Sequence, residues 1–233
     1  MMKTKQFILA SSLLFLVCSE MAAQSFLPGF KMFSHKKTAY LVLADGSKVE
    51  GFVDKVGRSK NYISSVVIKN DDGEKEYMPA EISEMYLPVN DLNKFSLKLE
   101  NATNMSKDYD LDLINEGYGF FENAEVNTGK ETQTLMMQLA NPGFDSKIKV
   151  YIDPNAIETG KASFGPISSG GVDRSYYLQY GEITTASKFS KADYKKGFLD
   201  LFASCPSLLE KIGSKGDWDD FAVHVMEFNN CTE

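Results

Sequence analysis

Two histidines, His35 and His224, limit the catalytic chemistry that this sequence can support. A Ser-His-Asp triad needs a histidine that is held by a carboxylate and reaches an activated nucleophile. No G-x-S-x-G turn is present to supply that nucleophile. The HExxH and CxxC patterns that assemble zinc sites are also missing. We therefore expect two solvated or helix-packed histidines, no catalytic residue, no metal and no cofactor.

Three acidic residues, Asp108, Asp110 and Asp112, have the spacing of the first half of a calcium loop. Such a loop needs glycine at its sixth position and glutamate at its twelfth, and the sixth residue here is Leu113. Apolar residues alternate with the three acids. This period of two predicts a half-buried strand at 109–113 with an acidic, solvated face.

The glycine-rich segment 165–171 lacks the GxxxxGK[ST] order that cradles phosphate groups, so we interpret it as a loop. It leads into a strand predicted at 175–180. Asp173, Arg174 and Tyr176 stand at this junction and offer an anion, a cation and an aromatic ring. We predict that these three residues form a small polar contact site, and they are the candidate binding residues of the chain. The alternative is a loop followed by an ordinary half-buried strand.

The chain carries 25 basic and 32 acidic residues, for a net charge of −7. Binding to a phosphate backbone requires clustered lysines and arginines, and no basic stripe occurs here, so we expect no nucleic-acid partner. A pair of carboxylates can hydrolyse a glycosidic bond. Among so many acidic residues no pair stands out, and the single tryptophan, Trp218, is assigned to the core.

The first 23 residues have the three parts of a secretory signal peptide. Lys3 and Lys5 precede a short apolar run at 7–17, and Ala23 supplies a small residue at the cleavage point. A lipoprotein cleavage before Cys18 is the rival interpretation. No later segment reaches the roughly 18 apolar residues of a membrane span. We therefore expect an exported protein, periplasmic or extracellular, without a transmembrane segment.

Two cysteines, Cys205 and Cys231, remain after the signal peptide is removed. Disulfides form and persist in oxidising compartments, and both residues fall in one predicted helical region. We predict a structural disulfide between them. Two separate thiols are the alternative.

Short alternating runs separated by tight turns predict the architecture. Asp45 and Gly46 form a strong hairpin signal, and Gly51 indicates a bulge or bend in the returning strand. After an irregular lead-in at 24–37, residues 38–90 are expected to form a five-stranded, barrel-like antiparallel unit. Its strands are predicted at 38–44, 47–54, 62–69, 75–78 and 84–87.

A second β-rich unit is predicted at 91–188, with strands that include 95–100, 132–139 and 147–152. Residues 189–233 are expected to be helical and packed on the β units, beginning with a capping box of Ser190 and Asp193. The expected fold class is therefore α+β and mainly β: a small antiparallel barrel-like unit plus a second β unit, with C-terminal helices.

The segments DGSKVEGFV, YISSVVIK and EYMPAEISEMYL resemble, in their order, a small Sm-like β-barrel. In that family the barrel oligomerises and binds RNA through loop residues. Those loop residues have no match here, and the chain is acidic and exported. The resemblance therefore implies the shape of the N-terminal unit and not an RNA function.

Over most of its length the chain also resembles a family of uncharacterised secreted proteins of Bacteroidetes bacteria. The shared features are Ala23-Gln24, the Asp45-Gly46 hairpin with Gly51, the segment 77–82 with its Tyr-x-Pro-x-x-Ile order, and Phe202-Ala-Ser-Cys205-Pro206. The resemblance implies an envelope location.

Together these features predict a non-catalytic binding or scaffolding protein of the cell envelope. Its expected partner is an envelope protein or a glycan. The alternative is a carboxylate-based hydrolase that acts on glycans or peptides, and it requires two carboxylates that converge in one pocket.

Overall fold

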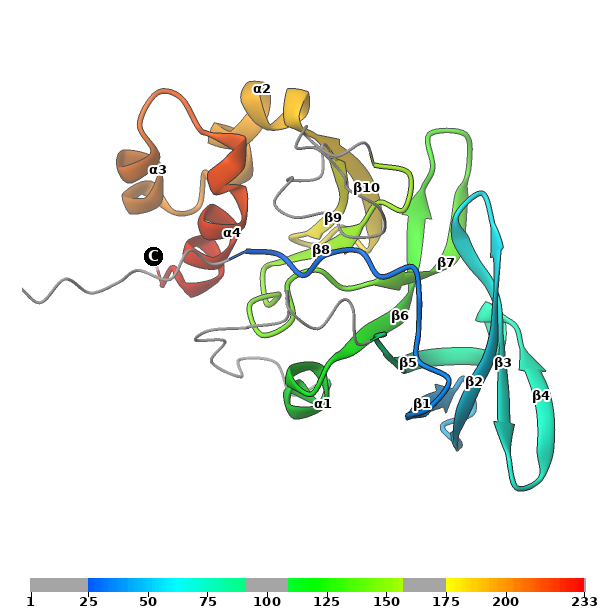
Figure 1. The fold of residues 1–233 in the computed structure, drawn as a ribbon. Coiled ribbons are helices and arrows are strands. Elements are labelled where there is room, and N and C mark those ends of the chain that lie inside the picture. Colours follow the sequence, from blue (N-terminus) through cyan, green and yellow to red (C-terminus); the bar gives the residue numbers. More distant parts are fainter. Residues whose placement is uncertain (1–24, 91–108, 157–174, 233) are drawn as a thin grey trace, which may run out of the picture.

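The computed structural model describes residues 25–90, 109–156 and 175–232 (Figure 1). The fold is mainly β, with a closed antiparallel barrel, additional strands and C-terminal helices, as the sequence predicts. The signal-peptide region and the strand predicted at 95–100 lie outside the described residues. The strands are β1 (Thr38–Leu43), β2 (Lys48–Ser59), β3 (Tyr62–Asn70), β4 (Gly73–Tyr77), β5 (Ile82–Pro88), β6 (Tyr118–Asn127), β7 (Thr132–Gln138), β8 (Ile148–Ile152), β9 (Ser175–Tyr180) and β10 (Thr185–Ser190). The helices are η1 (Pro79–Glu81), α1 (Leu111–Asn115), α2 (Lys191–Leu201), α3 (Pro206–Ile212), η3 (Trp218–Asp220) and α4 (Phe221–Asn230).

Six strands close the barrel in the order β1, β2, β3, β7, β6 and β5, and each pairs antiparallel with its neighbours. The β6–β7 pair is long, running from Phe121 opposite Gln138 to Asn127 opposite Thr132. The β3–β7 pair is a single residue pair, Ile63 opposite Met136. The barrel therefore has one narrow seam, which lies between β3 and β7.

The strands of the barrel differ from the five expected within 38–90. Strand β4 lies outside the barrel and pairs only with β3, while β6 and β7, from the segment 91–188, complete the ring. In β4 the first four residues, Gly73 to Glu76, are exposed, so this strand offers little apolar surface to a barrel interior. Phe121 of β6 and Met136 of β7 are buried and supply that surface.

The strand predicted at 109–113 is wrong, because part of this segment forms helix α1. The Asp110 side chain caps the helix by accepting hydrogen bonds from the backbone N–H groups of Asp112 and Leu113. Leu111 and Ile114 are buried, and a spacing of three residues places them on one face of a helix. A capping aspartate at the right position outweighs a short alternation of apolar and acidic residues.

Strands β8, β9 and β10 extend the sheet beyond the barrel. Strand β10, which the sequence did not indicate, pairs in parallel with the end of β6 and antiparallel with β9. Side chains of β8 and β9 alternate between two cores. Tyr151 and Tyr177 face the barrel core, while Val150, Tyr176 and Leu178 face the helices.

Helices α2, α3 and α4 lie on the side of β8–β10 that is remote from the barrel (Figure 1). Trp218 is fully buried in the core beneath them, as predicted, and its ring stacks on Phe221 with centroids 4.8 Å apart. The predicted disulfide between Cys205 and Cys231 is present and joins the start of α3 to the end of α4.

Residues 25–37 form no regular element and run across the barrel and the β8–β10 extension; we call this segment the N-terminal strap. Its aromatic residues pack on the body of the protein. Phe30 and Phe33 are buried in the barrel core, and Phe26 packs edge-on against Tyr176 and Phe221 of the helix-side core. The strap therefore contacts both cores.

Candidate functional site

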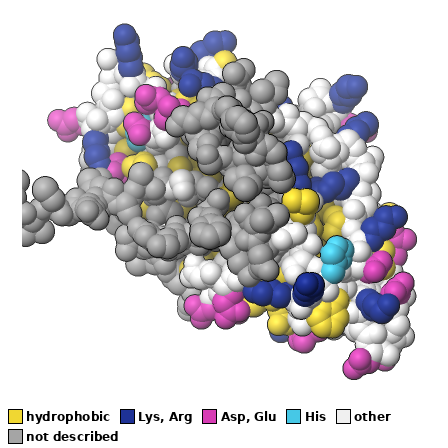
Figure 2. All heavy atoms as spheres, viewed as in Figure 1, with side chains coloured by type: hydrophobic (Ala, Val, Ile, Leu, Met, Phe, Trp, Pro, Cys, Tyr) yellow, Lys and Arg dark blue, Asp and Glu magenta, His cyan; other side chains and the backbone are white. Residues whose placement is uncertain are grey.

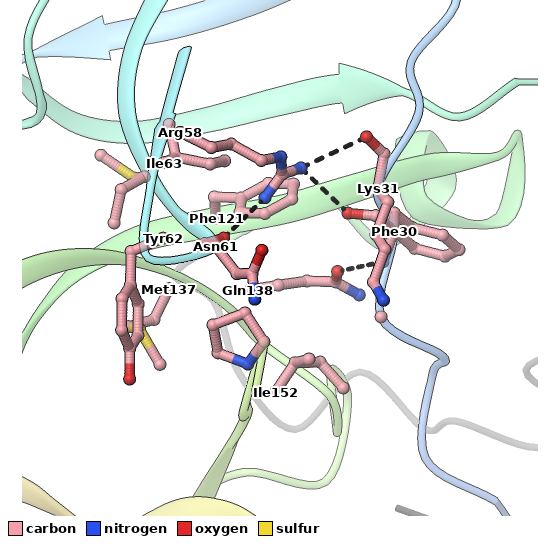
Figure 3. Close-up of a pocket in the computed structure, with 13 residues that line it drawn as sticks. Phe30, Lys31, Arg58, Asn61, Tyr62, Ile63, Phe121, Met137, Gln138 and Ile152 are labelled. Atoms are coloured by element: carbon pink, nitrogen blue, oxygen red, sulfur yellow. Dashed lines mark hydrogen bonds between the residues drawn. The ribbon is translucent and has the colours of Figure 1, made fainter. Parts of the chain in front are cut away.

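A cavity of about 220 Å³ opens where the N-terminal strap crosses the barrel near the β3–β7 seam (Figure 3). It is bounded by the strap, the tip of the β2–β3 hairpin, the end of β7 and the segment after β8. Most of the lining is apolar, and it includes the buried residues Ile63, Phe121, Met136, Met137 and Ile152. Thus strands far apart in sequence form a small apolar chamber.

Gln138, at the end of β7, fixes the strap that forms one wall of the cavity. Its Oε1 accepts a hydrogen bond from the Phe30 N–H at 2.8 Å, and its Nε2 donates one to the Pro28 carbonyl at 2.8 Å. The Leu27 N–H also donates to the Ala140 carbonyl at 2.7 Å. Gln138 is 5% exposed, and both ends of its amide have partners, as a buried polar group requires.

Arg58 stands at the rim of this cavity, near the tip of the β2–β3 hairpin. The turn residues Lys60 and Asn61 both have positive φ, 48° and 68°, which makes the hairpin tight. In Figure 3 the guanidinium points across the cavity toward the strap. Nη1 donates to the Asn61 carbonyl at 3.0 Å, and Nη2 lies 3.4 Å from the carbonyls of Phe30 and Lys31.

The charged residues that the structure describes around the cavity are positive. Of the described lining residues, only Arg58 and Lys31 are charged, and none is a carboxylate. Partial burial lowers the pKa of Arg58, although an arginine remains protonated at any physiological pH. The cavity therefore combines an apolar interior with a cationic rim. On the face shown in Figure 2, a group of basic side chains borders exposed hydrophobic ones to the right of the centre of the view.

A polar groove of about 590 Å³ shares Tyr62 and Ile63 with this cavity. The Tyr62 and Tyr177 hydroxyls lie 2.9 Å apart in its wall. Asp153 lines it but is only 2% exposed and is fully occupied: its Oδ2 accepts from the Ser175 hydroxyl at 2.7 Å and pairs with Lys188 Nζ at 2.8 Å. This arrangement is typical of a structural ion pair.

Of the three candidate binding residues that the sequence suggested, the structure describes only Tyr176. Asp173 and Arg174 lie outside the described residues. The Tyr176 ring is 4% exposed and packs against Phe26, Trp218 and Phe221 in the helix-side core. The cavity itself was missed, because Arg58 occupies a segment interpreted only as a turn and Gln138 ends an ordinary strand. The one available signal was that Arg58 is one of two arginines in the chain.

The histidines occupy the kinds of position expected for them. His35 Nδ1 lies 2.6 Å from the Val53 carbonyl oxygen. His224 stacks on the Tyr194 ring, with its Nδ1 2.5 Å from the Tyr194 hydroxyl. Burial lowers the pKa of His224. Among the described residues, no three His, Cys, Asp or Glu side chains gather as a metal site requires.

Burial raises the pKa of one carboxylate, Asp145, which accepts a hydrogen bond from the Tyr109 hydroxyl at 2.7 Å. Glu122 accepts from Lys149 Nζ at 2.7 Å and from the Tyr151 hydroxyl at 2.6 Å. Neither carboxylate lines the cavity or the polar groove. A glycosidase needs two carboxylates that face one cleft, and no carboxylate is among the described residues that line the cavity.

Comparison of the chain with models of protein families, with curated proteins and with solved structures found no significant match. Within the described ranges, no helix is both long enough and apolar enough to cross a bilayer.

Proposed function

We propose that the protein is an exported, non-catalytic binding protein of the cell envelope and that the cavity beside Arg58 holds a small ligand. One observation carries this proposal: the cavity is mostly apolar with few polar groups, which is the usual composition of a small-molecule site. The described residues of the lining include no nucleophile paired with a base and no carboxylate, so this lining suits retention of a ligand rather than its conversion.

Export is proposed from the signal-peptide pattern at 1–23 and agrees with the disulfide between Cys205 and Cys231. Disulfides persist in the periplasm and outside the cell and are rare in the cytosol. In that setting the ligand reaches the protein from the envelope or from the medium.

The binding proposal is tested by filling the cavity. Met137 is 2% exposed and lines the chamber, so Met137→Trp places a larger side chain there. We expect wild type to bind the neutral fluorescent probe N-phenyl-1-naphthylamine, and the variant to bind it at least tenfold more weakly, because the apolar volume is occupied. Fluorescence titration measures both affinities.

Met78→Trp is the matched control, since Met78 is 49% exposed and lies outside the cavity lining. It should bind the probe like wild type. Circular dichroism and urea unfolding show whether each variant is folded. A folded Met137→Trp protein that binds as tightly as wild type, or a wild type that does not bind at all, would contradict the proposal.

A further inference from the structure

We infer that the ligand of this cavity is an apolar chain that ends in a carboxylate, and that Arg58 binds the carboxylate at the cavity rim. This inference rests on the proposed binding function. It names the chemical class of the ligand and assigns its anionic end to one side chain.

The first support is the state of the Arg58 guanidinium. Ion pairs between described residues join lysines to carboxylates, as in Lys149 with Glu122 and Lys188 with Asp153. Among the described residues, Arg58 has only backbone carbonyls as partners, although the chain has seven more acidic than basic residues. A cation that pairs with no carboxylate in the described part of the chain is available for an external anion.

The second support is the hydrogen-bonding capacity that Arg58 retains. A guanidinium has five N–H donors, and a hydrogen bond from such a charged donor to a carboxylate is roughly twice as strong as one between neutral groups. The bonds to the Asn61, Phe30 and Lys31 carbonyls come from Nη1 and Nη2. Nε and the remaining Nη1 hydrogen stay unbonded. The carbonyls hold the side chain in place, so less conformational entropy is lost when an anion binds.

The third support is the charge and size of the chamber. Lys31 joins Arg58 in the lining, so an anion meets two cations and, among the described lining residues, no carboxylate. The cavity of about 220 Å³ equals the liquid volume of about seven water molecules. Ile63, Phe121 and Met137 make the interior apolar. A saturated chain of medium length satisfies both the volume and the lining, whereas a sugar would leave its hydroxyls unpaired.

Octanoate and octanol separate the contribution of the charge from that of the apolar chain. They share one chain and differ in the carboxylate. Isothermal titration calorimetry at pH 8 and low salt should show that wild type binds octanoate at least tenfold more tightly than octanol. Arg58→Gln should lower the octanoate affinity about tenfold and leave the octanol affinity unchanged, because only the charged partner is lost. Arg58→Lys should retain part of the preference for octanoate.

Lys55→Gln is the matched control, because Lys55 is exposed on the same strand as Arg58 and does not line the cavity. It changes the net charge equally and should preserve both affinities. Added salt should weaken octanoate binding and leave octanol binding unchanged.

The possible failures are distinguishable. If wild type binds neither compound and also fails to bind N-phenyl-1-naphthylamine, the cavity is not a binding site and the proposed function falls together with this inference. If wild type binds both compounds equally, the binding function stands and the carboxylate assignment is overturned. An Arg58→Gln protein that loses both ligands to the same extent would show that Arg58 only clamps the strap, which also overturns the assignment.

Discussion

Gly51 illustrates at the scale of one residue how close packing in the barrel wall constrains the sequence. A Cβ atom at this position would lie 2.6 Å from Ile68 Cγ2 and 2.6 Å from the Lys69 carbonyl oxygen on β3. The sequence indicated a bulge or bend at this glycine. The register of β2 against β3 instead shifts at two other places, between Val53 and Lys55 and between Gly57 and Arg58. Glycine is required here because another strand approaches, a property that no local pattern reveals.

Gly51→Ala is therefore expected to destabilise the protein by about 1–3 kcal/mol, as overpacking of a tight site does. The matched control is Gly197→Ala in α2, where a Cβ atom would meet nothing within 4 Å. That variant should stabilise the protein by about 0.5–1 kcal/mol, because alanine is the better helix former. Urea unfolding of both variants measures the two free energies. Equal effects of the two substitutions would contradict this explanation of Gly51.

At the scale of one element, α2 begins as the sequence predicts. The Ser190 side chain accepts a hydrogen bond from the Asp193 N–H, and the Asp193 carboxylate accepts from the Ser190 N–H and hydroxyl. These bonds to Ser190 lower the pKa of Asp193. A carboxylate whose pKa is lowered by folding stabilises the fold above its unfolded pKa, and this contribution disappears as pH falls through the folded pKa.

Asp193→Asn should accordingly cost on the order of 1 kcal/mol at pH 7, the usual value of a lost cap interaction. The difference in free energy of unfolding between this variant and wild type should shrink as pH falls below about 4. In that range Asp193 becomes protonated first in the unfolded protein and then, at lower pH, in the folded protein. Thermal or urea unfolding across pH 2.5 to 7 measures this trend. Asp200→Asn, exposed near the end of the same helix, should not destabilise, because an anion is unfavourable there. A difference at Asp193 that does not vary with pH would refute the assigned role.

At the scale of the whole molecule, β6 joins two cores. Residues 118–122 of β6 pair with β5, residues 121–127 pair with β7 and residues 125–127 pair with β10, so the barrel and the β8–β10 extension share one strand. The disulfide lies in the helix-side core, and the cavity opens beside the barrel core. A ligand in the cavity and the disulfide should therefore act on different parts of the fold.

Replacing both cysteines, Cys205→Ala with Cys231→Ala, should lower the free energy of unfolding by about 3 kcal/mol, given a sequence separation of 26 residues. Binding of N-phenyl-1-naphthylamine should stay within a factor of two of wild type, because the cavity is remote. Unfolding and fluorescence titrations measure the two effects. A non-reducing digest of protein isolated from its natural host should contain the linked cysteine peptides. Separately alkylated peptides would contradict both the bridge and the oxidising compartment.

Local signals in the sequence determined the main elements of this protein. Asp45-Gly46 specified a hairpin, Ser190 and Asp193 specified a helix start, and alternating runs specified the strands β1, β3 and β8. These predictions succeed because turns, caps and face periodicity depend on residues within one turn or one strand. The same reasoning predicted the pairing of Cys205 with Cys231, since both fall in one short helical region.

The tertiary structure alone decided which strands close the barrel and where a ligand fits. Ile63 and Met136 are 73 positions apart, and their contact creates the seam on which the cavity opens. Arg58 lies beside the strap, 27 and 28 positions away from its carbonyl partners in sequence. Turns and caps can be predicted from sequence because they form through hydrogen bonds between residues that are close in the chain. A cavity cannot, because it forms where surfaces from distant parts of the chain meet without filling the space between them.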